Sequence, residues 1–453
     1  MKKKILLSII ILSLLISCQS FVQVDVPPNE LSSQNIYDDV NAIESVFAGI
    51  YSDLSTITNS INAEMQISLA LNCDELVYSG NAQNYIEFYN STIQTDNATI
   101  NSAWDNLYKA IYSINTVLEG LATTKLDNKI KSEYIGEAKF IRAFFYFLLV
   151  NVYDEVPLVT ETGYEINGSL PRSPVEPIYE QILSDLVDAK SALSKEYKKE
   201  LRSRPNYYAA CTLLAKIYLF LGDYSNAETE SSEVIGSTDF QLSSLHVVFK
   251  QESKETIWQL SPVFPSYNTN IGRLLIPSSL TNNIVPTYYL SHKLIDSFEP
   301  NDERLREWIG TKSVGESTYF FPYKYQVRSG SMLSESLIFF RLSELYLIRA
   351  EARANRENLD DAIKDVNVVR KRSSLNETYP ITREELLTRI YEERRHELFC
   401  EWGNRWFDLK RSGKMDQILS VDKGANWQST DALWPIPITQ IESNPYLLQN
   451  PGY

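Results

Sequence analysis

The sequence has few of the residues on which metal and redox chemistry depend. Its three histidines, His246, His292 and His396, lie far apart in the chain, and its four cysteines show no CxxC spacing. Metal sites and disulfide frameworks need these residues in short, recurring spacings. HExxH, P-loop and GxSxG patterns are also missing. These absences argue against a metalloenzyme, a nucleotide-dependent enzyme or a serine hydrolase, and we expect neither a cofactor nor a bound metal.

Positive charge is also scarce. The chain has 43 Lys and Arg against 58 Asp and Glu, which gives a formal net charge of −15. Removing residues 1–17 takes away three lysines and no acid, so 40 basic and 58 acidic residues remain and the net charge becomes −18. A balance of this sign argues against nucleic acid or an anionic membrane surface as the partner.

Long hydrophobic runs are absent except at the N-terminus. Lys2, Lys3 and Lys4 precede an apolar run over residues 5–16, which is too short to cross a bilayer and is typical of a secretory signal. The run ends at Ser17-Cys18, a pattern that resembles a bacterial lipobox, although an ordinary signal with a chance cysteine is the alternative. We predict a leader over residues 1–17, lipid attachment at Cys18 and a polar tether over residues 18–33.

The rest of the chain contains mostly helical periodicity. Apolar residues recur at helical spacing over residues 36–54, 101–122, 131–153 and 175–195. The three cysteines that remain, Cys73, Cys211 and Cys400, are most simply explained as small buried apolar residues.

An internal repeat gives these helices an order. One segment has residues at the offsets of a tetratricopeptide repeat, and a later one matches more loosely. The positions are Cys211, Leu214, Ala215, Tyr218, Gly222, Tyr224 and Ala227, then Tyr346, Ala350, Arg353, Ala362, Val366 and Val369. Two further pairs of segments are candidates for degenerate versions of this repeat: residues 101–122 with 132–153, and residues 383–400 with the segment C-terminal to them. We therefore predict a mainly all-α fold with minor β-structure, built on a tetratricopeptide-like scaffold of about four helix pairs within one domain over residues 34–453.

Two irregular segments interrupt this scaffold. Residues 72–101 and 236–337 are rich in Ser, Asn and Tyr, and long irregular segments are usually functional or disordered. Their aromatic content argues against disorder, so we predict that they carry a binding face. The favoured ligand-binding residues are Asp74, Tyr85, Tyr89, Tyr267, Trp308 and Tyr319. For each of them the alternative is a buried structural aromatic or a solvated loop acid.

The densest run of charge and aromatics lies at residues 390–411. Glu393, Glu397 and Glu401 succeed one another at i, i+4 on a helix predicted over residues 381–399, with Thr382 and Glu385 as a capping box. Neighbouring carboxylates would lie roughly 5–6 Å apart at Cβ, close to the separation in a retaining glycosidase.

A structural role for this run is the alternative to catalysis, and the sequence favours it. Arg389 can reach Glu393, and Arg394 can reach Glu397, so we expect nearby guanidinium groups to lower the pKa of these carboxylates. A catalytic acid needs the opposite shift. The flanking tryptophans would cover such a network, and replacing Arg405 or Glu401 would then impair folding without a direct effect on ligand.

Several motifs together resemble the SusD/RagB family of surface lipoproteins. The C-terminal run ERRHELFCEWGNRWFDLKR at 393–411 resembles the signature of that family, and LWPIP at 433–437 and NPYLLQNPGY at 444–453 resemble its closing blocks. Further matches are VDVPP at 24–28, RLSELYLIRAEA at 341–352, the spaced residues Trp104, Tyr108, Ile111 and Asn115, and the mid-chain residues Pro286-Thr287, Phe298 and Asp302-Glu303-Arg304.

The resemblance implies a non-catalytic protein of the cell outer membrane, anchored by lipid and facing the exterior. It would capture an oligosaccharide, or in some cases a peptide, and pass it to a SusC-like TonB-dependent outer-membrane transporter. A carbohydrate-active enzyme using Glu393 and Glu397, and a helical-repeat adaptor of the envelope without a nutrient ligand, are the other hypotheses.

Overall fold

The fold was analysed in a computed structural model, which describes residues 36–55, 60–198, 200–262, 266–330, 332–380 and 382–453. The predicted leader over 1–17, Cys18 and the tether over 18–33 lie outside the described residues, so the division of the chain into leader, tether and one domain stays a prediction. Within the described ranges, no helix is both long enough and apolar enough to cross a membrane.

The prediction of a mainly helical fold with little β-structure is confirmed. The helices are α2 (Val40–Ser55), α3 (Glu64–Asn72), α4 (Gln83–Asn90), α5 (Ala98–Ala122), α6 (Asn128–Tyr153), α7 (Tyr164–Asn167), α8 (Val175–Ala192), α9 (Tyr207–Phe220), α10 (Tyr224–Ile235), α11 (Asn270–Leu275), α12 (His292–Ile295), α13 (Glu303–Glu307), α14 (Leu342–Asn355), α15 (Leu359–Arg372), α16 (Arg383–Leu398), α17 (Asn404–Arg411), α18 (Met415–Lys423) and α19 (Ile438–Ser443). The strands are β1 (Leu76–Tyr78), β2 (Thr256–Leu260), β3 (Tyr288–Leu290), β4 (Ile309–Val314), β5 (Ser317–Pro322) and β6 (Leu337–Arg341), and short 3-10 helices occur at Ile36–Asp38, Ser60–Asn62, Glu200–Arg202, Gly424–Asn426 and Ser429–Ala432.

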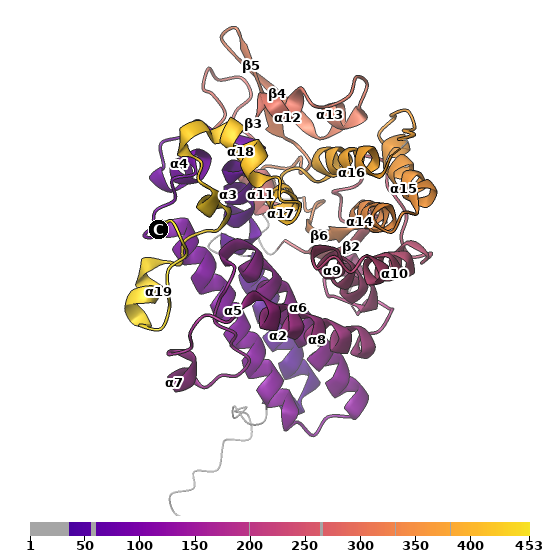
Figure 1. The fold of residues 1–453 in the computed structure, drawn as a ribbon. Coiled ribbons are helices and arrows are strands. Elements are labelled where there is room, and N and C mark those ends of the chain that lie inside the picture. The colour runs from indigo at the N-terminus through magenta and orange to yellow at the C-terminus, as the bar shows by residue number, and fades with distance from the viewer. Residues whose placement is uncertain (1–35, 56–59, 199, 263–265, 331, 381) are drawn as a thin grey trace, which may run out of the picture.

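The centre of the helical part is α6. Every residue from Phe140 to Tyr153 is buried, which explains why this stretch is apolar on all sides except at Arg142 and Asn151 and shows little amphipathic pattern. Helices α5 and α8 pack along it (Figure 1). Asn97 and Asp127 cap α5 and α6, since each side chain accepts a hydrogen bond from a backbone N–H of the first turn.

The two clearest predicted repeats are confirmed as helix pairs. Helix α9 packs on α10, α14 packs on α15, and α10 contacts α14, so pairs separated by about a hundred residues lie side by side (Figure 1). The first pair turns at Gly222, whose φ of +75° suits glycine. The second pair turns at Glu357, whose φ of +62° is unfavourable for a residue that carries a Cβ atom. Helices α5 and α6, and α16 and α17, also contact each other as expected; membership of the tetratricopeptide class itself stays a prediction.

Among the described residues, three two-stranded antiparallel sheets complete the fold, and five of their six strands lie in the irregular segment over residues 236–337 or extend past its end. β2 pairs with β6, and β4 forms a hairpin with β5. β1 pairs with β3, although about 210 residues separate them in the chain. The periodicity of the sequence indicated none of these short strands, because three to six residues are too few for a period-2 pattern to stand out.

Aromatic rings from four distant segments meet where β2 and β6 cross α6. The ring of Phe339 stacks on Trp258 at 4.0 Å and on Trp402 at 4.3 Å between centroids, and Phe144 meets these rings edge-on. Trp402 also donates a hydrogen bond from Nε1 to the carbonyl of Ile338. These contacts hold the chain after α16 against the main core.

Candidate functional site

Helix α16 carries the charges that first suggested chemistry. Its start is the predicted capping box: Thr382 Oγ1 accepts from the N–H of Glu385, and the Glu385 carboxylate accepts from the N–H of Thr382. Residue 381, the first residue of the predicted helix, lies outside the described residues. Further along, Glu393 and Glu397 are only 1% and 0% exposed. A helix therefore positions these carboxylates on its buried face.

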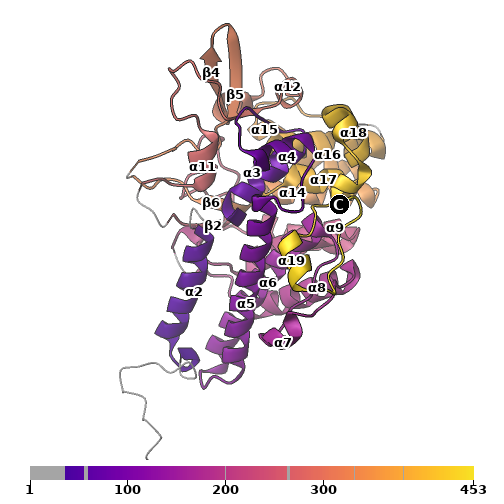
Figure 2. The same ribbon diagram turned by 90° about the vertical axis from the view of Figure 1, so that its left-hand side faces the viewer.

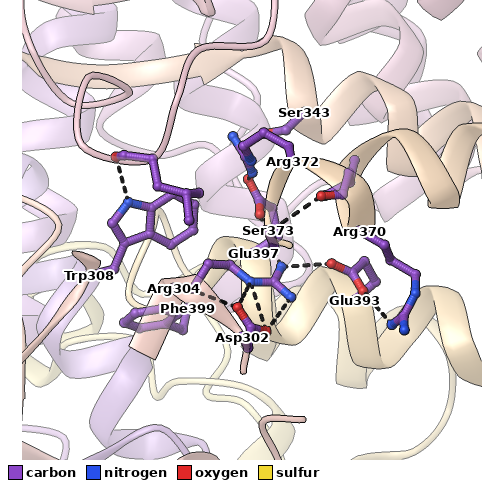
Figure 3. Close-up of polar contacts among 12 residues, drawn as sticks. Asp302, Arg304, Trp308, Ser343, Arg370, Arg372, Ser373, Glu393, Glu397 and Phe399 are labelled. Carbon is purple, nitrogen blue, oxygen red and sulfur yellow. Dashed lines mark hydrogen bonds and ion pairs between the residues drawn. The ribbon is translucent and has the colours of Figure 1, made fainter. Parts of the chain in front are cut away.

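Around them lies a set of charged residues that we call the ionic cluster. Its cations are Arg304, Arg341, Arg370, Arg372 and Lys324, and its anions are Glu255, Asp302, Glu393, Glu397 and Glu401. Arg304 Nη1 lies 2.7 Å from Glu393 Oε1 and 3.1 Å from Glu397 Oε2. Arg341 binds Glu397 and, at 2.8 Å, Glu401. Figure 3 shows Arg304 between Asp302 and Glu393, with Trp308 and Phe399 to one side.

The predicted partners of these carboxylates were wrong. Arg389 pairs with Glu299 and Glu392, and Arg394 pairs with Asp408 of α17 at 2.7 Å. Glu393 and Glu397 are instead neutralised by guanidinium groups from α13, β6 and α15. Helical spacing identifies only neighbours on the same helix, whereas these carboxylates face inward toward elements that come from other parts of the chain.

Burial and charge act in opposite directions on these groups. Burial raises the pKa of Glu397 and Glu401, but arginine charges, Arg372 and Arg341 above all for Glu397, outweigh it and hold both pKa values below the usual range. For Glu393 burial wins over Arg304, so its pKa is raised, contrary to the expectation. Neither Glu393 nor Glu397 has a surface that a substrate could reach, and the arrangement is that of a structural network.

Two of the predicted ligand residues, Asp74 and Trp308, are occupied by structural contacts. Asp74 is bound by Arg395 at 2.7 Å and by two nitrogens of Arg405; burial raises its pKa, but the two arginines outweigh it and lower the pKa to about 2. Trp308 is 1% exposed, donates to the carbonyl of Leu245 and packs beside the ionic cluster. In this structure neither side chain offers surface to a ligand.

Tyr267 lies apart from these residues. Its side chain is 9% exposed, and the guanidinium of Arg273 lies 5.6 Å from its ring centroid. Burial raises the pKa of its hydroxyl. Tyr267 therefore sits under the surface near α11, away from the other predicted tyrosines in sequence and in its contacts.

The other three candidates, Tyr85, Tyr89 and Tyr319, are half-buried and gather at one end of the molecule. The pairing of β1 with β3 makes this possible, because Val77 lies opposite Tyr289 and Tyr78 opposite Tyr288. Backbone bonds from Ser79 to Thr287 and from Ser291 to Glu75 extend the pairing. The two segments predicted to carry the binding face, 72–101 and 236–337, thus meet. Figures 1 and 2 show α4, β3, β5, α12 and α18 at this end.

We call the half-buried residues Tyr78, Tyr85, Tyr89, Tyr289 and Tyr319 the tyrosine surface. Successive residues of a strand point to opposite faces. On one face Tyr78 lies 5.5 Å from Tyr85, between ring centroids; on the other, Tyr289 meets Tyr319 edge-on at 5.1 Å. The pKa of Tyr289 is raised by burial and then by Tyr89 and Tyr319, so these three phenols are neighbours.

Polar groups surround the second face. Lys423 Nζ lies 5.0 Å from the ring centroid of Tyr89, and Lys293 pairs with Asp422 at 2.9 Å. Lys293 is largely exposed and Asp422 partly so. Half-exposed aromatic faces beside hydrogen-bonding groups are the recurring composition of sites for small polar ligands.

Sequence reasoning missed Tyr78 and Tyr289 as members of this surface. The only signal was the adjacent pair Tyr288-Tyr289, since neighbouring residues on a strand must face opposite sides. No group of three or more His, Cys, Asp or Glu that could hold a metal ion is found among the described residues. Cys73, Cys211 and Cys400 are buried and unpaired with one another.

Comparison with known proteins agrees with the motifs. A family model described as "Starch-binding associating with outer membrane" matches residues 25–219, and the model of the SusD family matches residues 282–453. The SusD-like protein P38 of Formosa agariphila is 24% identical over 99% of this chain and 98% of its own.

Solved structures extend the likeness to the fold. A SusD superfamily protein of Bacteroides vulgatus superposes with a TM-score of 0.83 at 20% identity, covering 92% of this chain and 99% of that one. A laminarin-binding SusD-like protein gives a TM-score of 0.79 at 25% identity, covering 92% of this chain and all of the other.

Proposed function

Because the chain belongs to the SusD/RagB family, whose members are non-catalytic glycan-binding proteins associated with the outer membrane, we propose that it captures an oligosaccharide at the cell surface and passes it to a SusC-like TonB-dependent transporter. Lipid attached to Cys18 anchors it, and residues 34–453 act as a single ligand-binding domain. The observation that carries the proposal is the second face of the tyrosine surface, where Tyr89, Tyr289 and Tyr319 of the two segments expected to bind ligand come together.

The chemistry of this surface suits a sugar. Pyranose rings expose C–H faces that pack on aromatic rings, while their hydroxyls need nearby donors and acceptors. Tyr89, Tyr289 and Tyr319 supply half-exposed aromatic faces and phenolic hydroxyls. Lys293 and Asp422 supply a donor and an acceptor beside them. The net negative charge favours a neutral glycan over a polyanionic one.

Titration calorimetry with laminarin and starch oligosaccharides tests the binding. The relatives described as laminarin-binding and starch-binding make these two glycans the first to try. We expect one of them to bind, Tyr289→Ala to weaken it about tenfold, and Tyr164→Ala to leave it unchanged because Tyr164 is 78% exposed on α7 at the far end. If peptides bind and no glycan does, the ligand class is peptide and not glycan. If Tyr289→Ala and Tyr164→Ala bind the glycan with equal affinity, the tyrosine surface is not the binding site.

The partnership with a transporter has its own test. Affinity purification of the lipoprotein from outer membranes in mild detergent is expected to recover a large β-barrel in a one-to-one ratio. A Cys18→Ala variant is expected to be released in soluble form, since stable anchoring needs the acyl chains. A firm complex with other envelope proteins, without a barrel and without any ligand, would favour the adaptor hypothesis.

A further inference from the structure

A small cavity lies between α16, α17 and the turn that precedes β1, outside the tyrosine surface and beside the ionic cluster. Its volume is about 20 Å³, which is space for roughly one or two water-sized occupants. It is lined by Glu75, Tyr391, Arg394, Arg395, Leu398, Arg405, Asp408, Leu409, Ser412 and Lys414. The cavity is therefore small, polar and largely enclosed by charged side chains.

Several polar atoms of the residues that line this cavity lack a partner among the described residues. They are Nη1 and Nη2 of Arg394, Nε of Arg395 and Oε1 of Glu75, all buried. The other groups of these residues are engaged: Arg394 Nε donates to Asp408, Arg395 Nη2 to Asp74, and Glu75 Oε2 accepts from the N–H of Cys400. A guanidinium Nη carries two hydrogens and Nε carries one, so donors far outnumber the single carboxylate oxygen.

The charges on the lining have the same bias. Arg394, Arg395, Arg405 and Lys414 are cationic and Glu75 and Asp408 are anionic. Asp74, just outside the lining, already binds Arg395 and Arg405, so the cations exceed the anions by one. Both oxygens of Asp408 are already bound, by Arg394 and by Arg411. An unpartnered buried donor is destabilising, so the site favours an occupant that accepts several hydrogen bonds at once.

We propose that this cavity binds one monoatomic anion of the size of chloride, held by the free guanidinium nitrogens of Arg394 and the Nε of Arg395. A sulfate or phosphate is too large for the space. A water accepts only two hydrogen bonds and carries no charge. A halide can accept one hydrogen from each of the three nitrogens, and its negative charge complements the cationic lining.

Glu75 makes this binding depend on pH. Burial raises the pKa of Glu75 to about 7, the N–H of Cys400 and the charges of Arg405 and Lys324 lower it, and Asp74 raises it. Several titratable or charged groups surround Glu75. Those of its own segment are Cys73 and Asp74. Those of other segments are Lys324, Tyr391, Arg394, Arg395, Cys400, Arg405, Asp408 and Lys414. Protonated, Glu75 can donate to the anion; ionised, it repels it. Affinity therefore falls as pH rises through about 7.

Part of the lining is half-buried and not fully buried. Tyr391, Ser412 and Lys414 are half-buried, and they line the side nearest the solvent. Lys414 Nζ lies 4.6 Å from the ring centroid of Tyr391. A cation at the entrance attracts anions and excludes cations.

Calorimetric melting of the full-length lipoprotein in nonionic detergent tests the proposal. At pH 6, sodium chloride should raise the Tm by about 1–2 °C over sodium gluconate of equal ionic strength, and at pH 8 the increment should shrink. Glu75→Gln should remove the difference between the two pH values, while Glu119→Gln, an exposed acid on α5, should behave like the wild type. Equal melting in both salts at pH 6 would overturn the proposal.

Diffraction from wild-type crystals locates the anion, and this test does not need the variant to fold. Crystals grown in sodium bromide at pH 6 should show an anomalous peak beside Arg394, and that peak should weaken at pH 8. A water-sized feature without anomalous signal in the cavity would refute the anion, whatever the melting data show.

Discussion

The ionic cluster and the tyrosine surface are built from similar residues and behave in opposite ways. Both combine aromatic rings with charged groups, and both assemble from segments far apart in the chain. In the ionic cluster every carboxylate meets at least one cation, and Trp308 beside it is almost wholly buried. On the tyrosine surface five aromatic side chains stay half-exposed, and a lysine–aspartate pair lies at its edge.

The difference indicates that composition alone does not separate the structural network from the proposed binding surface; accessibility and the pairing of charges do. A cluster in which all partners come from the protein has nothing left to offer a ligand, whereas half-exposed rings keep a face for one. Changes in the ionic cluster should therefore alter stability, and changes on the tyrosine surface should alter affinity. Variants of each region can test this division.

Arg341→Met should cause the largest loss of stability. It removes a cation shared by Glu255, Glu397 and Glu401 and leaves buried negative charge uncompensated. Breaking a buried pair in this way costs about 3–5 kcal/mol. Urea denaturation measures it, with Arg306→Met as the control because the Arg306 side chain is 69% exposed. Normal stability with abolished glycan binding would reverse the assignment of the two regions.

Acid should weaken the ion pairs of Asp74 and Asp408, which lie beside the ionic cluster. The pKa values of Asp74 and Asp408 are lowered to about 2 from the usual 3.8, because arginine charges outweigh burial. A depressed folded-state pKa gives stability that is present above pH 3.8 and lost as pH falls toward 2. We expect each aspartate to account for about 2 kcal/mol of that loss.

Denaturation between pH 5 and pH 2.5 measures this effect. Asp74→Asn should flatten the slope, while Asp53→Asn, an exposed change on α2, should leave it as it is. A wild-type protein whose stability did not change over this range would show that the Asp74 and Asp408 pairs contribute little.

Trp308→Phe should lower stability by about 2 kcal/mol and leave glycan affinity unchanged. The change removes the hydrogen bond to the carbonyl of Leu245 and leaves a void beside the ionic cluster. Thermal melting and calorimetric titration on the same sample separate the two effects. Weaker glycan binding at unchanged melting temperature would restore Trp308 as a ligand residue.

Among these variants, Tyr319→Ala should have the smallest effect. It should change the free energy of glycan binding and leave the free energy of unfolding unchanged. Losing one aromatic face from the tyrosine surface is expected to cost about 1 kcal/mol of affinity, with the melting temperature within error of the wild type. Titration with the glycan that binds best measures it. The control is Tyr446→Ala, since Tyr446 is largely exposed near the C-terminus. A drop in stability without a change in affinity would mean that Tyr319 is structural.

Local features of the fold could be predicted from the sequence because they depend on neighbouring residues. The capping box of α16, the buried face of α6 and the turn at Gly222 are all encoded in short-range patterns. The pairs that define the two sites could not be predicted this way. Asp74 meets Arg395 and Arg405 across more than three hundred residues, and Glu397 meets Arg341 rather than a residue on its own helix. Such contacts depend on how elements pack, which periodicity does not encode.

The pairing of β1 with β3 bears on how this protein can change over generations. The two strands are joined through backbone groups, with bonds such as Ser79 N–H to the carbonyl of Thr287, and these do not depend on the identity of the side chains. Substitutions at positions 77, 289 and 319 can therefore change the side chains on this surface without altering the backbone hydrogen bonds that pair β1 with β3. If the proposed function holds, a lineage that meets a new glycan can acquire a different specificity at this end, while selection for folding acts on the buried charges elsewhere.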